Sequence, residues 1–375
     1  MKTEWVHKKL GDDDVAKIIM GQSPSSASYN DENIGLPFLQ GCADFGEVFP
    51  KTSVYCNEPL KVAPQNSILM SVRAPVGTIN KADQKYIIGR GLCSIVSLIN
   101  NDYLYYYLLQ NKNRLEQKAQ GSTFLAINSA EVNDFDVSYP ESLSTQRRIA
   151  AILTSADKVI AATQKTIAKY KQIKQGMMED LLNEQCTMNN VQWRKVKLGE
   201  VGKISMCKRV FSFETSTESE IPFYKIGTFG KDADAFISRQ LYEEYKSKFS
   251  YPKVGDILIS ASGTIGRTVV YDGEPAYFQD SNIIWIDNNE TIVLNQFLYY
   301  QYQIISWNLE GSTIARLYND NFNRIEITIP DLPAQRRIAA ILSGIDAKIA
   351  AEEKVLEKYE KVKKGLMERL LNDNK

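Results

Sequence analysis

The chain has little of the chemistry on which most enzymes depend. Its 375 residues include a single histidine, His7, which argues against a histidine-based metal site or a histidine-dependent catalytic triad. We interpret His7 as an incidental surface residue. The sequence also lacks the phosphate loop Gly-x-x-x-x-Gly-Lys-Ser/Thr, the dinucleotide fingerprint Gly-x-Gly-x-x-Gly and the Asn/Asp-Pro-Pro-Tyr/Phe signature of adenine methyltransferases. We therefore predict no catalytic residues, no cofactor and no metal, and no enzymatic activity for this chain alone.

Cysteines are few, and long apolar runs are missing. The five cysteines are scattered, and no two form a Cys-x-x-Cys pair, which is typical of reduced thiols in a cytoplasm. No apolar run is long enough to cross a bilayer, and the opening MKTEWVHKKL does not resemble a signal peptide. We expect a cytoplasmic protein that makes no use of a membrane.

The most informative feature is a stretch that occurs twice. Residues 143–183 and 332–372 align without a gap and are identical at a little over half of their positions, beginning with LSTQRRIAAIL and LPAQRRIAAIL. Ala, Leu, Lys, Gln and Glu dominate both copies, and proline is absent after the first turn, so each copy is predicted to form one long helix. A helix of about 35 residues is roughly 50 Å long.

Apolar residues in both copies recur at alternating steps of four and three, which is the heptad pattern of a coiled coil. The predicted seam consists of Ile160, Ile167, Tyr170, Met177 and Leu181 in the first copy and of Ile349, Leu356, Tyr359, Leu366 and Leu370 in the second. Polar residues interrupt the seam, so neither helix is expected to be stable alone. An isolated heptad run often marks homodimerisation, but two matched copies in one chain favour pairing within the molecule.

The remaining sequence forms two blocks of similar length, one before each helix. We predict globular domains at 1–142 and 185–331, and long helices at 143–184 and 332–375. The first block has 13 Lys+Arg against 16 Asp+Glu and the second 15 against 18, whereas the helices have 7 against 4 and 10 against 7. Basic helices can face phosphates or an acidic protein, but Lys and Arg are also good helix formers on solvated faces. A nucleic-acid surface on the acidic blocks would have to be a local patch.

Both blocks run through the same order of features. Each has a short strand-like lead, a polar turn, an apolar-Pro-Phe strand, a second strand that enters a turn, a third strand, an aromatic helix, a Gly-Ser-Thr turn and a last strand before the long helix. The pairs include residues 36–40 and 221–225, 67–71 and 256–260, 76–79 and 262–265, 91–98 and 281–286, 103–110 and 296–302, and 121–123 and 311–313. In the third pair Gly77 is aligned with Gly263. We conclude that the chain is a tandem duplication of an α+β globule followed by a long helix.

These features together resemble the specificity subunit of type I restriction–modification systems. The resemblance is carried by the two Gln-Arg-Arg-Ile-Ala helix starts, the paired Leu-Leu helix ends, the Gly-Ser-Thr turns and the segment 221–227, and it covers essentially the whole chain. The motif is weaker in the first globule, where Leu39-Gln40 stands in place of Tyr224-Lys225.

The resemblance implies two target recognition domains, each reading half of a split DNA sequence. It implies an antiparallel coiled coil that separates the two domains, with an approximate two-fold axis between the repeats. It also implies partners: double-stranded DNA, two copies of an adenine-N6 methyltransferase (modification) subunit, and restriction subunits that act as translocase and nuclease.

Residues that contact DNA are expected at the polar turns, because Arg, Lys, Asn, Gln, Ser and Thr recognise base edges and phosphates. We select Gln22, Ser23, Ser71, Arg73, Thr78 and Arg90 in the first globule and Lys208, Arg209, Lys225, Ser262, Thr264 and Arg267 in the second. For any one of them an ordinary surface or turn role is an equally good interpretation. The aromatic helices resemble base-stacking platforms, but their helical spacing favours a place in the core.

Two other functions stay open at this point. The acidic globules are compatible with a protein-interaction scaffold built on the tandem coiled-coil repeat, with no role in DNA binding. An enzyme is disfavoured by the missing motifs.

Overall fold

A computed structural model describes residues 4–118, 126–183, 192–307, 317 and 319–373. The two Gly-Ser-Thr turns and Cys186 lie outside the described residues. The chain forms two compact units, Met1–Lys165 with Lys354–Lys375 and Thr166–Glu353. Each unit therefore combines one globule with part of both long helices, a grouping that differs from the division into separate globules and helices made from the sequence.

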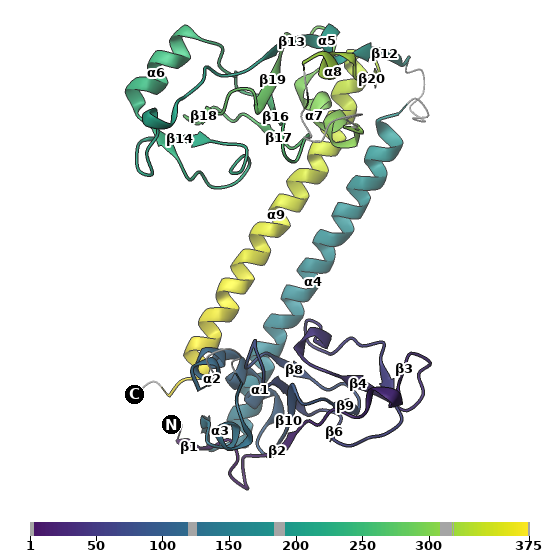
Figure 1. Cartoon of the computed structure of the whole chain (residues 1–375), viewed down its shortest axis with the longest axis vertical. Coiled ribbons are helices and arrows are strands. Elements are labelled where there is room, and N and C mark those ends of the chain that lie inside the picture. Colours follow the sequence, from purple (N-terminus) through teal and green to yellow (C-terminus); the bar gives the residue numbers. More distant parts are fainter. Residues whose placement is uncertain (1–3, 119–125, 184–191, 308–316, 318, 374–375) are drawn as a thin grey trace. The chain divides into compact units, whose positions relative to one another are not determined.

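Unit 1 is built on three small sheets and the aromatic helix α1 (Figure 1). Strands β1 and β11 pair antiparallel, a four-stranded antiparallel sheet has the order β2-β10-β7-β8, and a five-stranded sheet has the order β3-β5-β4-β9-β6 with β4 and β9 parallel. The elements are β1 (Trp5–Lys9), β2 (Ala16–Met20), β3 (Tyr29–Asn30), β4 (Leu36–Leu39), β5 (Tyr55–Cys56), β6 (Val62–Ala63), β7 (Ile68–Ser71), β8 (Ile79–Lys81), β9 (Tyr86–Ile88), β10 (Leu92–Ser97), α1 (Asn101–Gln110), α2 (Lys112–Lys118), α3 (Ser129–Asn133), β11 (Asp136–Pro140) and the first part of α4 (Leu143–Leu181).

Unit 2 repeats this plan (Figure 1). Strands β12 and β20 pair antiparallel, the four-stranded sheet has the order β13-β19-β16-β17, and a three-stranded sheet β15-β14-β18 contains a parallel pair, β14 with β18. The elements are β12 (Arg194–Lys197), α5 (Leu198–Val201), β13 (Gly202–Ser205), β14 (Ile221–Tyr224), β15 (Phe236–Ile237), α6 (Arg239–Lys248), β16 (Ile257–Ser260), β17 (Thr268–Val270), β18 (Tyr277–Phe278), β19 (Ile283–Asn288), α7 (Asn295–Ile304), α8 (Asn319–Arg324), β20 (Glu326–Ile329) and the first part of α9 (Leu332–Leu370).

The two-stranded and four-stranded sheets have the same strand order in both units, which agrees with a duplication, and the chain is α+β as predicted. The aromatic helices α1 and α7 belong to the core, as their spacing indicated: Tyr103, Tyr106, Phe297 and Tyr302 are each at most 2% exposed. Unit 2 also contains α6, a largely exposed helix of mixed charge whose buried residue is Tyr242, and this helix was not predicted from the sequence.

The glutamine of the repeated Gln-Arg-Arg motif fastens the start of each long helix to its own globule. The side chain of Gln146 accepts a hydrogen bond from the Asn100 N–H (2.9 Å) and donates one to the Pro140 carbonyl (2.8 Å). Gln335 accepts from the Leu294 N–H (2.8 Å) and donates to the carbonyls of Ile292 (3.0 Å) and Pro330 (2.9 Å). Both side chains are buried, so these bonds replace water that the backbone groups would otherwise need.

Replacing Gln335 with Ala is therefore expected to destabilise unit 2. Three backbone groups, one buried and two partly buried, would lose their partner. Each such loss costs about 1–3 kcal/mol when it is not relieved by water, so we expect a loss of about 3 kcal/mol in the free energy of unfolding. Gln146→Ala should cost about 2 kcal/mol because two groups are affected. Urea unfolding followed by circular dichroism measures both changes. The exposed neighbour Arg336→Ala is the control, and equal midpoints for R336A and Q335A would contradict this role of the glutamine.

In unit 1 the start of α4 packs beside the end of α9. The core of this unit includes Ile149 and Leu153 from α4, Met367 from α9 and Leu371 directly after the end of α9. Asp157 on α4 forms an ion pair with Lys363 on α9 (2.5 Å) and accepts a hydrogen bond from the Tyr106 hydroxyl (2.6 Å). Burial of the Tyr106 ring and this hydrogen bond raise the pKa of Tyr106.

Unit 2 contains the same arrangement with the roles of the helices exchanged. Asp346 on α9 pairs with Lys174 on α4 (2.7 Å) and accepts from the Tyr300 hydroxyl (2.8 Å), while the Lys174 ammonium also lies 5.4 Å from the centre of the Tyr300 ring. We call these two Tyr–Asp–Lys groups, Tyr106–Asp157–Lys363 and Tyr300–Asp346–Lys174, the helix clamps. Each joins α4, α9 and the aromatic helix of one globule.

In the middle of each helix, buried residues stand at the predicted seam positions. Near the helix ends, the buried residues stand one position after the predicted ones. Ile160, Ile167 and Ile349 are buried, and Tyr170, Leu356, Met177, Leu181, Leu366 and Leu370 are half-buried. Tyr359 is 40% exposed, whereas Met178, Leu182, Met367 and Leu371, each one residue beyond a predicted seam position, are buried. At its ends each helix contacts a globule as well as the other helix, so the buried stripe is wider there than a strict heptad seam.

Candidate nucleic-acid interface

The turn between β7 and β8 presents one predicted residue to solvent and uses two others to hold its shape. Arg73 is exposed. Ser71 is buried, its hydroxyl donates to the Pro75 carbonyl (2.6 Å), and it accepts from the Thr78 N–H (2.8 Å). The Thr78 hydroxyl also donates to the Pro75 carbonyl (3.2 Å). Ser71 and Thr78 therefore stabilise the turn from which Arg73 projects.

The corresponding turn of unit 2 lies between β16 and β17. Ser260 donates to the Thr264 carbonyl (2.5 Å) and accepts from the Arg267 N–H (2.9 Å), so it plays the part of Ser71. Thr264 is exposed, and Ser262 donates to the side chain of Asn282 (2.8 Å). Arg267 is half-buried, and its guanidinium donates to the Phe229 carbonyl (3.0 Å), which makes it a support of the loop as well as a cation.

The hydrogen bonds correct how the two turns are aligned. The N–H of Gly77 donates to Ser71 and the N–H of Gly266 to Ser260, so Gly77 corresponds to Gly266 and not to Gly263 as the sequence pattern indicated. Arg73 is therefore equivalent to Ser262, and Arg267 to Thr78. The two arginines lie on the same element but at opposite sides of the turn.

A second polar turn follows β2 in unit 1 and approaches the same region. The Ser23 hydroxyl accepts from the Arg90 N–H (3.2 Å), and the Gln22 N–H donates to the Ile88 carbonyl (2.9 Å). Gln22 and Arg90 are exposed. The structure thus brings Gln22, Ser23 and Arg90 together, from positions almost 70 residues apart in the chain.

In unit 2 the matching turn borders a cavity of about 470 Å³. Two predicted residues, Arg209 and Lys225, line it. The other polar and aromatic groups of the lining, which include Phe211, Gln279, Asp280 and Asn282, were not predicted from the sequence. Lys208 is exposed beside this turn, with its ammonium 5.3 Å from the centre of the Phe249 ring.

Cations at this cavity are partly compensated by carboxylates. Arg209 pairs with Asp280 (2.9 Å), whose side chain is largely buried, and Lys225 pairs with Asp234 (2.8 Å), which is exposed. Exposed pairs contribute little to stability and are screened by salt, so Lys225 can exchange its carboxylate for another anion at small cost. Arg209 keeps three-fifths of its side chain exposed despite the pair. The cavity therefore offers cationic and amide groups, which are the groups that recognise phosphates and base edges.

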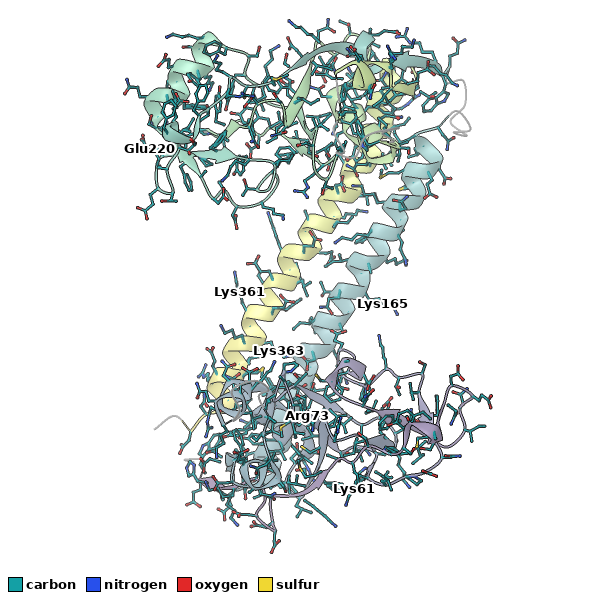
Figure 2. All side chains as sticks on the ribbon, in the orientation of Figure 1. Lys61, Arg73, Lys165, Glu220, Lys361 and Lys363 are labelled. Atoms are coloured by element: carbon teal, nitrogen blue, oxygen red, sulfur yellow. The ribbon has the colours of Figure 1, made fainter. Side chains whose placement is uncertain are left out.

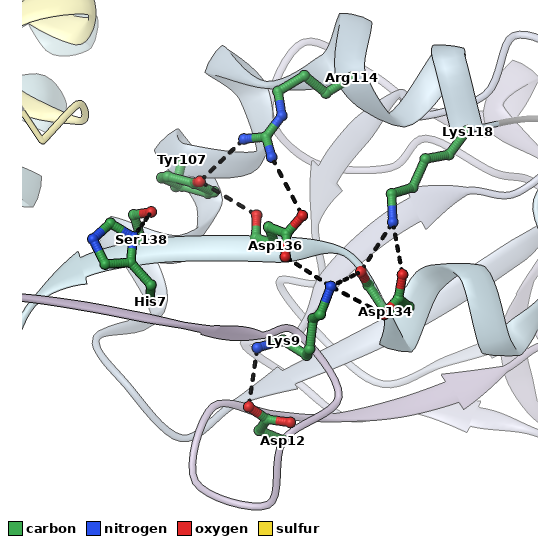
Figure 3. A network of polar contacts seen from close by, with 9 residues as sticks. All are labelled: His7, Lys9, Asp12, Tyr107, Arg114, Lys118, Asp134, Asp136 and Ser138. Carbon is green, nitrogen blue, oxygen red and sulfur yellow. Dashed lines mark hydrogen bonds and ion pairs between the residues drawn. The ribbon is translucent and has the colours of Figure 1, made fainter.

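His7 lies in a polar network at the edge of unit 1 (Figure 3). Its Nδ1 lies 2.8 Å from the Ser138 hydroxyl, and its Nε2 lies 3.3 Å from the Asp373 carboxylate beyond the end of α9. Nearby, Lys9 pairs with Asp134 and Asp136, and its hydrogen bonds lower the pKa of both carboxyls. These groups connect β1, β11 and the end of α9 at the surface, so His7 is a surface residue with a local structural contact.

The described residues include neither a cluster of metal ligands nor a membrane-spanning helix. No group of three or more His, Cys, Asp or Glu is placed to hold a metal ion in the part of the chain that the structure describes. None of the described helices is long and apolar enough to cross a membrane.

Cys93 and Cys207 are buried, which raises the pKa of each thiol to about 12 and keeps both in the unreactive protonated form.

Comparison with known proteins identifies the family. The chain belongs to the family of type I restriction modification DNA specificity domains, whose model matches residues 2–172 and again 190–361. It is 47% identical over 261 residues to a Haemophilus influenzae protein named as a type I restriction enzyme specificity subunit, covering 66% of this chain and 65% of that protein. It is 41% identical over 182 residues to a Methanocaldococcus jannaschii protein named as the type I restriction enzyme MjaX specificity subunit, covering 48% of this chain and 43% of that one. The chain thus matches less than two thirds of the length of these two relatives.

Solved structures share the fold. The S subunit of a type I restriction–modification system from M. genitalium is similar with a TM-score of 0.68 at 18% identity, over 100% of this chain and 98% of that chain. A second structure, from work on complex assembly and conformational transition of the type I system, gives a TM-score of 0.61 at 17% identity over the full length of both chains.

Proposed function

We propose that the chain is the specificity subunit of a type I restriction–modification complex and that it reads a DNA target in two parts. The observation that carries this proposal is the repeated surface: each globule presents a serine-braced turn next to a polar turn, but with different side chains. Arg73, Gln22 and Arg90 stand in unit 1 where unit 2 has Ser262, Lys208 and Ser281. One scaffold with two sets of side chains is suited to two half-sites of different sequence.

The two globules, 1–142 and 185–331, are proposed as target recognition domains joined by an antiparallel coiled coil of the helices 143–184 and 332–375. The helix clamps support the antiparallel direction. Asp157 and Lys174 are 17 residues apart on α4, and their partners Lys363 and Asp346 are 17 residues apart on α9 in the reverse order. Equal spacing allows the two helices to run side by side through the interval without a slip in register.

This arrangement would give the repeats an approximate two-fold axis and hold the two domains at a fixed separation. Each long helix has 39 residues, which corresponds to about 58 Å of α-helix. Successive major-groove faces of DNA are about 34–36 Å apart, so helices of this length suffice to place the domains one turn apart after allowance for their packed ends.

We propose that two methyltransferase (modification) subunits and the restriction–translocation subunits dock on this chain, as the family implies. Exposed lysines on both helices, including Lys165 and Lys361 within unit 1, offer a polar surface for DNA or for an acidic partner (Figure 2). The chain itself is proposed to be non-catalytic and cytoplasmic. Incubating the purified chain with labelled methyl donor and DNA tests the first point, and methyl transfer by this chain alone would contradict it.

The alternative is a protein-interaction scaffold without a DNA role, which the acidic globules keep open. A gel-shift assay with and without the methyltransferase subunit separates the two functions. DNA recognition predicts a preference for one split sequence over scrambled DNA in at least one of these conditions. Binding without any sequence preference in both conditions would support the scaffold.

Arg73 provides the sharpest single-residue test of the unit 1 surface, because it is exposed and lies in a turn that the Ser71 and Thr78 hydrogen bonds stabilise. We expect Arg73→Ala to weaken binding about tenfold and to relax discrimination at one position of one half-site, since a good base contact is worth about 1–3 kcal/mol. Competition binding with single base-pair substitutions measures this. Lys61→Ala, another exposed cation of the same domain, is the control. Equal weakening on every DNA sequence would assign Arg73 to a phosphate.

A further inference from the structure

We propose that Phe213, backed by Phe211, makes an apolar base contact that only the unit 2 domain possesses, and that it reads one position of one half-site. This inference rests on the proposed DNA-recognition function. Phe213 has the highest exposure among the large hydrophobic residues of the described chain, 83%, and Phe211 is 48% exposed. Their rings lie nearly parallel, with centroids 5.6 Å apart and an interplanar angle of 6°. The two rings are therefore parallel and offset, and most of the Phe213 ring is open to solvent.

The short turn that carries these rings is fixed by Glu214. The Glu214 carboxylate accepts from the Phe211 N–H (2.8 Å) and from the Tyr245 hydroxyl (3.0 Å), and the Glu214 N–H donates to the Phe211 carbonyl (2.9 Å). The turn is thereby tied to helix α6, which carries Tyr245. An aromatic pair held in place loses little conformational entropy when it binds, so its apolar area can contribute to affinity.

The surroundings of the pair favour DNA over a protein partner. Phe211 lines the same 470 Å³ cavity as Arg209, Lys225, Gln279 and Asn282. Arginine and the amides of Gln and Asn are the side chains that recognise guanine and adenine edges, and Phe makes apolar contact with the thymine methyl group in the major groove. A protein-docking surface would instead be expected to have few charged residues at its centre.

Unit 1 supplies a matched comparison. Ile19 of β2 lies opposite Ser94, and Ser205 of β13 lies opposite Trp285, at equivalent places in the two four-stranded sheets. In both units a 3-10 helix begins seven residues after this strand position, at Ser26 and at Ser212. Phe211 and Phe213 therefore stand where unit 1 has Ser25 and Ala27, so the other domain tolerates small side chains at both positions.

The test replaces the pair with the residues of the other domain, in the variant F211S/F213A, and adds Phe213→Leu as an apolar rescue. The target is first determined with the wild-type complex of this chain and its methyltransferase subunits, and affinity is then measured for every single base-pair substitution. We expect F211S/F213A to lose about tenfold in affinity for the target, and one position in one half-site to lose its substitution penalty. The other half-site should keep all its penalties, and F213L should restore part of the affinity. Val254→Ala, at a 72% exposed apolar residue outside the cavity lining, should change neither.

Three results would overturn this inference. An equal loss on all DNA would show a general effect, a loss of methyltransferase binding with unchanged DNA preference would assign the pair to a protein interface, and no change at all would leave it without this role. Retained circular dichroism and the same urea midpoint as the wild type show that F211S/F213A is folded. If the wild-type complex shows no sequence preference, the proposed function itself is contradicted. That outcome is distinguishable from the three results above, because they concern the F211S/F213A variant and not the wild type.

Discussion

Seven-residue copies inserted into both long helices are expected to lengthen the gap between the two half-sites. The copies repeat residues 159–165 in α4 and 354–360 in α9, which lie where the chain divides into its two units. One heptad adds about 10 Å of helix and preserves the seam. At about 3.4 Å per base pair, the preferred gap should grow by about 3 base pairs. Such a change also rotates the second half-site by about a third of a turn, so we expect weaker binding as well.

The change in preferred gap length is measured by selecting bound molecules from a DNA library in which the half-sites are fixed and the gap between them varies. The control is the same insertion in α4 alone, which separates the partners of one helix clamp by an extra heptad and should abolish preference for any gap. If the double insertion selects the original gap, the helices do not set the distance between half-sites, and the proposed coiled-coil spacer is wrong.

Removing both helix clamps is expected to have the largest effect on stability. In Asp157→Ala/Asp346→Ala, the Tyr300 hydroxyl loses its acceptor, and the Tyr106 hydroxyl keeps only its longer bond to the Thr154 hydroxyl (3.2 Å). Lys363 and Lys174 lose their carboxylates. An unsatisfied buried hydroxyl costs about 1–3 kcal/mol, and a partly exposed ion pair adds about 0–1 kcal/mol after screening. We therefore expect a loss of about 4 kcal/mol in total, shared between the two units, in urea unfolding. The Asn variants should lose less, because an amide oxygen still accepts from tyrosine.

An exposed pair between the same helices is the control for the clamps. Lys171 and Glu353 lie 2.8 Å apart, but both side chains are about half exposed. Glu353→Ala should therefore change stability by less than about 0.5 kcal/mol. A clamp variant that unfolds at the same urea concentration as E353A would show that the Tyr–Asp–Lys groups are not what holds α4 to α9.

Much of the fold could be predicted from the sequence because its signals are local and occur twice. The 39-residue helices follow from composition and heptad spacing, and short strands such as β7 and β16 follow from four consecutive apolar or small residues before a turn. The role of Gln146 and Gln335 could not be predicted. A buried glutamine that bonds to the backbone of another element has the same sequence context as one that faces solvent.

The candidate interface was less predictable, because it depends on tertiary register. Ser71 reads as a polar residue at a turn, but it is buried and satisfied within that turn. The three-residue misalignment of the turns arose because Gly263 and Gly266 both fit the pattern, and only backbone hydrogen bonds distinguish them. Phe211 and Phe213 did carry a signal, since they are the two large apolar residues of the otherwise polar segment 211–220.

The measurement that tests the central claim most directly is the mapping of methylated adenines in DNA from cells that express this chain with its methyltransferase subunit. The proposed function, in which helices of one chain separate two dissimilar domains, predicts methylation within a single target of two short defined sequences separated by a gap of constant length. Methylation at a continuous target, or at two sequences whose gap varies freely, would contradict the account.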